Sequence, residues 1–213
     1  MKTSLSHLAL SVLLGFGLAS ATPSHAADSA ERAAATKGKI EALRVECAKI
    51  RNQTLFTMEA LKRLNVKGVE LRPEFEKYKT ELAEMAVQAK VARDRADSMK
   101  KNGQASFAAW EQEVEVINNP DIRKEAQARY TKRKKSYNKI LSALEEAKKE
   151  LVPFMSDLND IRKLLESELT QGTVAATKST IRSADWHGED VRESFTDVEQ
   201  EIDRVAAELA KYK

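Results

Sequence analysis

The chain has 213 residues, with 36 Lys and Arg against 33 Asp and Glu and a formal net charge of +3. This balance excludes the concentrated basic surface on which nucleic-acid binding depends. Only 6% aromatic residues and 7 Gly leave little material for a β-sheet core. The length allows one ordinary domain or one long bundle. We therefore expect an all-α protein that does not bind nucleic acid.

Residues 1–26 have the features of a secretory signal peptide. Lys2 provides a positive start, and the apolar run Leu8–Ala19 is shorter than the about 20 residues that span a bilayer. Small residues at Ser24 and Ala26 indicate cleavage before residue 27, and a second cleavage triplet lies at 19–21. An uncleaved membrane anchor is the alternative.

No Cys follows the apolar run, so we expect no lipid on the N-terminus. Residues 1–26 contain one Lys and no acidic residue, so the mature chain has a net charge of 35 − 33 = +2. No second apolar stretch is present. We predict a periplasmic protein that is soluble there.

Cys47 is the only cysteine, so no disulfide can form within one chain. It lies four residues after Leu43 and three before Ile50, on the apolar face of a predicted helix. We expect a buried thiol that packs as a small hydrophobic side chain. A disulfide between two subunits in an oxidising compartment is the alternative.

Apolar residues three and four positions apart predict a first helix over residues 37–64. The repeat consists of Ile40, Leu43, Cys47, Ile50, Thr54, Thr57, Leu61 and Leu64. Asn65 and Gly68 follow, and both tolerate the left-handed conformation found beyond helix ends. Residues 27–36 carry no apolar repeat, and we expect them to be frayed or loosely helical.

A second helix is predicted to begin at Pro73, whose fixed φ suits a first turn. Its repeat consists of Phe75, Tyr78, Leu82, Met85, Ala89, Ala92, Ala96 and Met99. At Gly103 the repeat is interrupted, and it resumes at Phe107 with an offset of one residue, like a coiled-coil stutter. We expect a kink or a break at Gly103.

The strongest apolar repeat of the chain covers residues 130–169. Its average spacing of about 3.5 residues gives one continuous apolar face, which another helix covers best. Asn119 is placed to cap this third helix and Pro120 to open it. Pro153 lies inside the helix. Because the repeat continues in phase beyond it, we predict a kinked but continuous helix, with a break at Val152 as the alternative.

Thr170-Gln171-Gly172 is predicted to form a third turn, with Gly172 as the cap. The repeat of a fourth helix follows: Val174, Thr177, Ile181, Ala184, Gly188, Val191, Phe195, Val198, Ile202, Val205, Leu209 and Tyr212. Short turns make neighbouring helices antiparallel. Residues 27–213 should form one elongated antiparallel bundle, or coiled coil, of about four helices, each about 45 to 75 Å long.

The densest group of metal-ligand residues is Asp185-Trp186-His187-Gly188-Glu189-Asp190. Asp185 and Glu189 share a helix face, but His187 lies about 200° around the helix from Asp185. His187 is also the only histidine of the mature chain, and zinc sites use more nitrogen or sulfur ligands. We predict no metal site here, but a solvated helix face with a contact through Trp186.

The strongest basic run is Lys132-Arg133-Lys134-Lys135, preceded by Arg123, Lys124 and Arg129. This run could contact the phosphate groups of lipid or lipopolysaccharide. The simpler interpretation is a solvated helix face that pairs with Glu side chains of neighbouring helices.

Recognisable catalytic residues are missing from the sequence. A nucleophile needs a base and an orienting group, and one thiol and one histidine on different helices do not provide them. No Gly-rich loop is present to hold a phosphate. We therefore predict that the protein is not an enzyme and binds no cofactor, and we interpret Trp110 and Trp186 as packing anchors.

Five stretches together carry a resemblance to a known family. They are Arg44-Val45-Glu46-x-Ala48-Lys49, Ala108-x-Trp110-Glu111-x-Glu113, Asn118-x-x-Asp121-Ile122-Arg123, Tyr137, and Ala147…Leu151-Val152-Pro153-Phe154…Asp157. Over nearly the whole mature chain, this order resembles a family of exported bacterial all-helical proteins that is DUF2959-like and of unknown function. The resemblance implies no catalytic or binding residues. Relatives often look like lipoproteins, whereas this chain lacks the Cys beside its signal.

Three functional hypotheses follow from the sequence. The first is a non-enzymatic scaffold or protein-interaction protein of the cell envelope, with a protein partner. The second is an amphipathic lipid binder whose helices open against a membrane surface. The third, which we rank last, is a metal or small-ligand binder that uses residues 185–190. The partner, the biological process and the oligomeric state, including a homo-oligomer, stay open.

Overall fold

The computed structural model describes the backbone of residues 23–210 and the side chains of residues 37–207. This part of the chain contains no strand and five helices: α1 (Pro23–Arg63), α2 (Leu71–Glu115), α3 (Pro120–Ser167), α4 (Gln171–Ala176) and α5 (Lys178–Ala210). The four long helices have 41, 45, 48 and 33 residues, or about 50 to 72 Å. The all-α prediction is confirmed. The predicted signal segment up to residue 22 lies outside the described residues.

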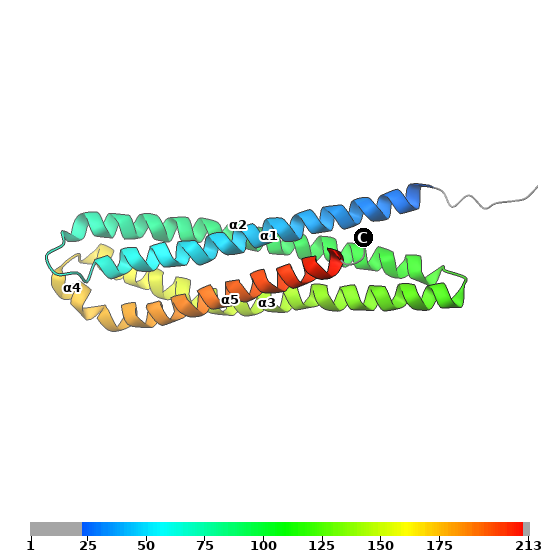
Figure 1. Cartoon of the computed structure of the whole chain (residues 1–213). Coiled ribbons are helices and arrows are strands. Elements are labelled where there is room, and N and C mark those ends of the chain that lie inside the picture. The colour runs from blue at the N-terminus through cyan, green and yellow to red at the C-terminus, as the bar shows by residue number, and fades with distance from the viewer. Residues whose placement is uncertain (1–22, 211–213) are drawn as a thin grey trace, which may run out of the picture.

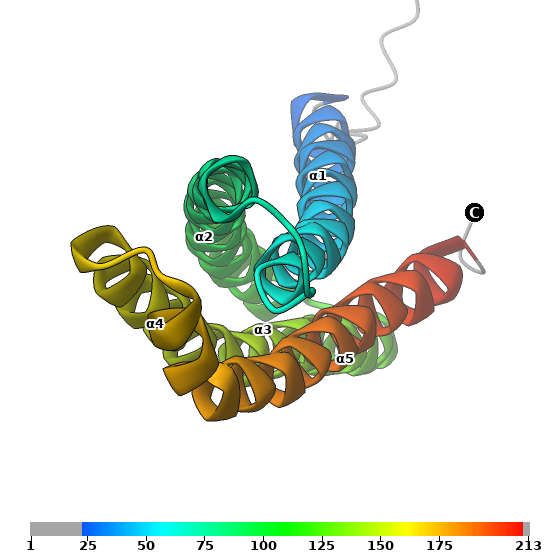
Figure 2. The same cartoon turned by 90° about the vertical axis from the view of Figure 1, so that its left-hand side faces the viewer.

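The long helices form an elongated antiparallel bundle (Figure 1). α1 packs against α2 and α5, and α3 packs against α5 and α2, so the four helices close around one core. The end-on view shows this ring, with the short α4 at the corner between α3 and α5 (Figure 2). Within the described residues, no helix is both long and apolar enough to cross a bilayer.

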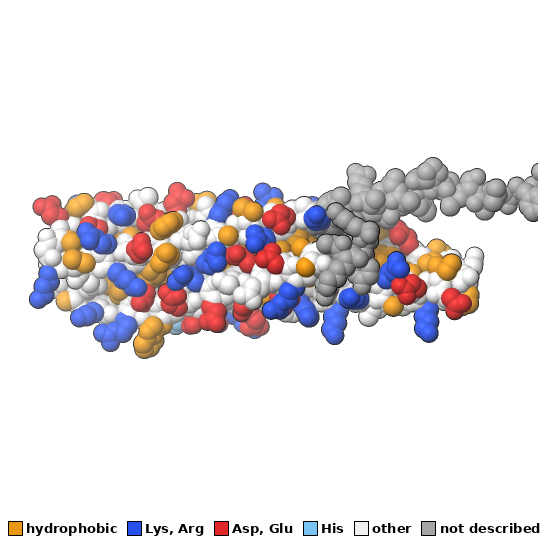
Figure 3. Space-filling model, in the orientation of Figure 1, with side chains coloured by type: hydrophobic (Ala, Val, Ile, Leu, Met, Phe, Trp, Pro, Cys, Tyr) orange, Lys and Arg blue, Asp and Glu red, His pale blue; other side chains and the backbone are white. Residues whose placement is uncertain are grey.

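The apolar repeats predicted from the sequence line this core. Fully buried side chains come from all four long helices: Leu43, Ile50, Leu61, Leu64, Tyr78, Met85, Met99, Ile140, Phe154, Leu158, Ile161, Leu165, Ala184, Val191, Val198 and Ile202. On the face seen in Figure 3, Lys and Arg are interspersed with Asp and Glu over the outer surface. The repeats are therefore used for packing between helices, and the outer surface carries the charges.

The first two helices begin earlier than predicted. α1 starts at Pro23, so residues 27–36, which were expected to be frayed or loosely helical, belong to it. It ends at Arg63, and Gly68 has a φ of 81°, as expected for a residue beyond a helix end. α2 starts at Leu71 rather than at Pro73. Pro73 is tolerated because N–H groups of the first turn have no partner within the helix.

The break predicted at Gly103 as one of two outcomes is wrong, because α2 continues through this residue to Glu115. Gly103 is buried, and a Cβ there would overlap the ring of Tyr137 on α3, with Cε2 at 2.8 Å. The Tyr137 hydroxyl donates to the backbone carbonyl of Met99 at 2.7 Å. The interruption of the apolar repeat is therefore a position at which α2 provides space for a large side chain of α3.

The start of α3 is as predicted. The Asn119 side chain caps the helix by accepting hydrogen bonds from Asp121 N at 3.0 Å and Ile122 N at 3.1 Å, and Pro120 is the first helical residue. α3 also continues through Pro153, so the alternative of a break at Val152 is wrong. Pro153 is exposed, and water can satisfy the carbonyl that loses its helical hydrogen bond.

The fourth predicted helix is divided in two. Gly172 does not form the cap; Thr170 caps α4, and its hydroxyl accepts from Thr173 N at 3.1 Å. α4 ends at Ala176, and the hydroxyl of the buried Thr177 that follows it donates to the carbonyl of Val174 at 2.8 Å. A threonine side chain that bonds the backbone in this way competes with regular helix geometry. α5 begins at the next residue and runs back along the bundle.

Two tyrosines fix the register of α2 against α3. The Tyr78 hydroxyl donates to Leu158 O at 2.7 Å, and the Tyr137 hydroxyl donates to Met99 O at 2.7 Å. The two positions on α2 are 21 residues apart, as are the two on α3, which equals three heptads. The helices thus keep one antiparallel register over this whole length.

Substitution of Gly103 by Ala tests the close approach of Tyr137. The new Cβ has no space, so we expect the free energy of unfolding to fall by about 1–3 kcal/mol despite the higher helix propensity of Ala. The same substitution at Gly38, where nothing lies within 4 Å, should raise it by up to about 1 kcal/mol. Urea unfolding followed by circular dichroism measures both. Equal stability of the Gly103→Ala variant and the wild type would contradict this packing.

Candidate functional site: the groove between α3 and α5

An open groove of about 880 Å³ lies between α3 and α5. Its α3 wall extends from Tyr130 to Glu146, a length of about 24 Å at 1.5 Å per residue. Its α5 wall extends from Ser194 to Arg204. Both walls belong to rigid helices of the bundle, so the groove does not depend on a loop.

The α3 wall is basic. Lys134, Lys135 and Lys139 line it together with the uncharged Thr131, Asn138 and Ser142. The Lys134 ammonium donates to the Tyr130 hydroxyl at 2.6 Å and lies 5.0 Å from the centre of that ring. This hydrogen bond raises the pKa of Lys134 above its usual value. Lys134 therefore stays positively charged under all physiological conditions.

The α5 wall carries both signs. Asp197, Glu201 and Arg204 line it with Ser194 and Gln200. Arg204 pairs with Glu201 three residues earlier on the same helix. Because basic residues of α3 face carboxylates of α5 across an open channel, the groove offers donors and acceptors along its whole length. It suits an elongated polar segment better than a compact apolar ligand, which needs an enclosed apolar pocket.

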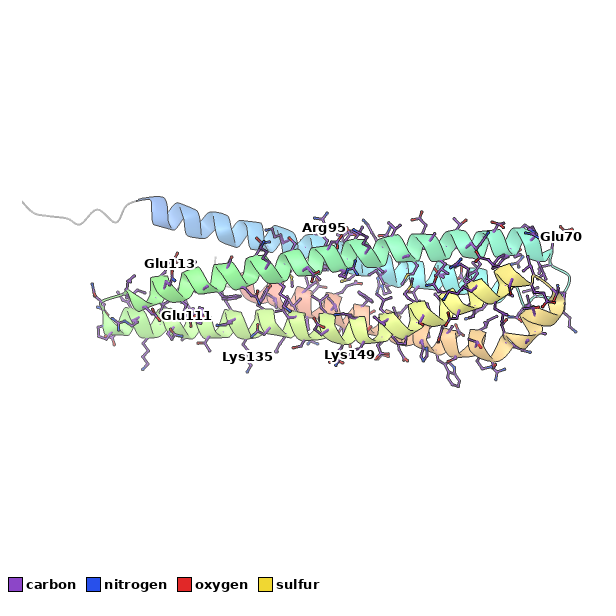
Figure 4. All side chains as sticks on the ribbon, turned by 180° about the vertical axis from the view of Figure 1, so that it is seen from behind. Glu70, Arg95, Glu111, Glu113, Lys135 and Lys149 are labelled. Atoms are coloured by element: carbon purple, nitrogen blue, oxygen red, sulfur yellow. The ribbon has the colours of Figure 1, made fainter. Side chains whose placement is uncertain are left out.

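The basic run predicted from the sequence is divided between two environments. Arg133 and Lys134 are half-buried and lie over aromatic rings. The Arg133 guanidinium is 5.2 Å from the centre of the Trp110 ring, and the Lys134 ammonium lies over the Tyr130 ring. Lys132 and Lys135 are exposed, and Figure 4 shows Lys135 projecting away from the bundle. Arg129 pairs at 2.9 Å with Glu125 of its own helix. Sequence analysis predicted Glu partners from neighbouring helices, but the Glu that pairs with Arg129 is on the same helix.

The residues of the predicted 185–190 group do not converge. Asp185 pairs with Lys62 of α1, whereas His187 Nδ1 lies 3.0 Å from Asp157 Oδ2 of α3. Glu189 pairs with Arg192. Across the described part of the chain, no group of three or more His, Cys, Asp or Glu residues is placed to hold a metal ion.

The two tryptophans have different roles. Trp110 is half-buried and packs against Phe107, Tyr130 and Arg133, as predicted for an anchor. The prediction for Trp186 is wrong, because its side chain is 68% exposed. Its neighbours Asp185 and His187 reach α1 and α3 on either side, which leaves Trp186 on the outer face of α5.

Cys47 is fully buried, so the prediction of a buried thiol is confirmed. Burial raises the pKa of this thiol to about 12, with smaller contributions from the carboxylates of Glu199 and Glu46. Glu46 is itself only 6% exposed and is paired with Lys49 at 3.2 Å. A disulfide to a second subunit would require Cys47 to leave the core.

Sequence analysis did not find the groove or the buried Glu46. The α5 residues that line the groove are polar and lie outside the apolar repeat, so nothing distinguishes them from a solvated helix face. For Glu46, a signal was present: it directly precedes Cys47, a core position, so it lies at the edge of the apolar stripe. Its burial depends on a neighbouring helix lying over that edge, which the periodicity of one helix cannot reveal. Gln53, one heptad later in α1, bonds to Glu81 of α2.

Comparisons with known proteins address the family of the chain. Residues 30–211 match the family described as "Protein of unknown function (DUF2959)". The chain belongs to this family. Neither the curated proteins nor the solved structures yield a match to the chain. The resemblance inferred from the sequence is therefore confirmed, and this DUF2959 protein has the antiparallel bundle described above.

The buried thiol gives a prediction on reactivity. Because the thiolate is the reactive form and the pKa of Cys47 is raised to about 12, we expect no measurable reaction with a disulfide reagent at pH 7 to 9 in the folded protein. In urea the thiol should react at once. An unfolded Cys ionises near pH 8.5. Raising the pH to 9 would therefore speed up the reaction of an exposed thiol, but not that of the buried Cys47. Reaction of the native protein at the rate of a free thiol would contradict the placement.

Proposed function

We propose that this DUF2959 protein is a non-enzymatic interaction protein of the cell envelope that holds a polar segment of a partner protein in the α3–α5 groove. The observation that supports this proposal is the groove itself, about 880 Å³ in volume and lined by both signs of charge. A 24 Å wall matches about 16 residues of helix or about 7 residues of strand. The predicted export places the partner in the periplasm.

Rigidity of the walls also favours such a role. The aromatic cluster formed by Phe107, Trp110, Tyr130 and Tyr137 supports the start of the α3 wall, with ring centres 5.4 to 6.3 Å apart. A prearranged groove reduces the entropy that binding must overcome. The long helices would then serve as a scaffold that presents the groove at a fixed place along the rod.

Site-specific photo-crosslinking tests the groove. A photoreactive residue at Asn138, inside the groove, should give a discrete adduct in the native envelope. The same residue at Val152, which is 60% exposed on the same helix, should give none. Substitution of Ser142 by Arg should reduce the Asn138 adduct about tenfold, since it places a long charged side chain in the groove.

Ser156→Arg provides the matched control for Ser142→Arg. It introduces the same side chain two heptads further along α3, at an exposed position outside the groove, and should leave the adduct unchanged. Equal loss in both variants, or equal adducts from Asn138 and Val152, would contradict binding in the groove.

A second candidate function is contact with an anionic membrane surface. It is favoured by the exposure of two basic residues of α3, Lys132 and Lys135, the second of which also lines the α3–α5 groove. The apolar faces of the helices are turned into the core, so such contact would be electrostatic and would not require the bundle to open. Each basic residue near an anionic surface contributes about 1 kcal/mol.

Vesicle flotation tests this candidate. The protein should float with phosphatidylglycerol vesicles at low salt and dissociate at about 0.5 M salt, because surface charges are then screened. The double variant Lys132→Glu/Lys135→Glu should not float. The control double variant Lys148→Glu/Lys163→Glu, at exposed positions elsewhere on α3, should float like the wild type. Absence of flotation of the wild type at low salt would exclude the candidate.

A further inference from the structure

The hairpin end, residues 110–133 around the α2–α3 turn, is the least covered part of the bundle. α5 ends well before this turn, and the hairpin continues beyond it (Figure 1). The α5 residue nearest its C-terminus in the α3–α5 groove is Arg204, which shares that groove with Tyr130. Residues of α3 before Tyr130 therefore have α2 as their helical neighbour but lack the cover that α5 gives to the rest of α3.

An apolar groove of about 510 Å³ lies in this hairpin end. It is lined by Trp110 of α2 and by Asp121, Ile122, Glu125, Ala126 and Arg129 of α3. Ile122 is 59% exposed, and Val116 at the turn is 75% exposed. Hydrophobic side chains are visible at this end of the molecule in Figure 3. Exposed apolar surface gathered at one place, with a polar rim, is typical of an interaction site.

The charges along this groove are arranged in a self-complementary order. Asp121 and Glu125 come first along α3 and Arg129 follows, each four residues after the last. If a second α3 lies antiparallel to the first and is centred near residue 127, Glu125 of each copy faces Arg129 of the other. A two-fold contact requires such a self-complementary surface.

We propose that two copies of the chain associate through their hairpin ends, with the α3 helices antiparallel and the Trp110–Ile122 grooves facing each other. In this pair, the hairpin end of each copy would cover the α2–α3 surface of the other. Four helices would then pack together there, as they do in the rest of the bundle, where α1 and α5 provide the other two. Ile122 would lose its contact with water. The surface is small, so the association is weak and concentration-dependent.

An anionic membrane is a poorer occupant of this groove. Its lining contains two acidic residues and one basic residue of α3, so it has no positive charge in excess to attract a negative surface. For a second copy, the two-fold arrangement provides two matched pairs of opposite charge, each between Glu125 of one copy and Arg129 of the other. The order of the charges thus favours a protein copy over a lipid surface.

The association would leave the α3–α5 groove accessible. Arg129 and Thr131 flank Tyr130 on the helix, and successive residues differ by about 100° in direction. Arg129 lines the hairpin groove and Thr131 lines the α3–α5 groove, so the two grooves lie on opposite flanks of α3. The proposed pairing therefore stands independently of the proposed function.

Sedimentation equilibrium of the full chain between about 1 μM and 1 mM tests the pairing. The weight-average mass of the wild type should rise toward twice the monomer mass. Ile122→Asp should weaken association at least about tenfold, because it places a charge on the apolar lining of the contact. The control Val152→Asp changes an equally exposed residue of the same helix and should associate like the wild type.

A charge exchange tests the antiparallel register. Glu125→Arg and Arg129→Glu should each be monomeric, because each places like charges opposite one another in the pair. An equimolar mixture of the two variants should dimerise, since every contact is then between opposite charges. Circular dichroism verifies that each variant is folded, and their Glu125–Arg129 pair lies on the surface.

Three results would overturn the proposal. One is a wild type that stays monomeric up to about 1 mM. Another is equal association of Ile122→Asp and Val152→Asp, which would place the contact elsewhere on the molecule. The last is a mixture of charge variants that stays monomeric although the wild type dimerises, which would exclude this register.

Discussion

The structure depends on a single antiparallel register between α2 and α3, held by the buried hydroxyls of Tyr78 and Tyr137. Each hydroxyl reaches a backbone carbonyl of the opposite helix, and a buried hydroxyl without a partner would cost several kcal/mol. A shift of either helix along its axis would deprive both tyrosine hydroxyls of their carbonyl acceptors. It would also move Tyr137 away from Gly103, the one place in α2 that has space for its ring.

α1 and α5 pack against the α2–α3 pair, and their positions determine which surfaces of that pair stay exposed. α1 is joined to α2 by Gln53 and Thr57, which both donate to the carbonyl of Glu81, at 3.0 and 3.2 Å. α5 closes the ring through Asp203, which pairs with Arg44 of α1 at 2.7 Å. The α3–α5 groove follows one flank of α3, and the hairpin groove lies on its other flank. The position of α5 therefore determines both grooves: one lies where α5 runs beside α3, and the other lies beyond the end of α5.

The differences between expectation and structure have local physical causes. Gly103 suggested a break because Gly weakens an isolated helix, but the gap it leaves is filled from α3. Thr177 fits the apolar repeat and is buried, but its hydroxyl donates to Val174 O at the point where α4 ends. Trp186 was interpreted as a packing anchor, but it is exposed, and the core side of α5 is occupied by residues such as Ala184 and Val191.

The sequence by itself determined the four long helices, most of their ends and the side of each that is buried, because a repeat of three and four residues is a property of one helix. It also indicated the family, which the match over residues 30–211 confirms. Only the tertiary structure decided which helices are neighbours, which polar flank of α3 faces α5, and that Glu46 is buried. A periodic pattern shows which side of a helix is apolar, but it does not show which other helix packs against that side. A groove is formed by two neighbouring helices, so the pattern of one helix cannot predict it.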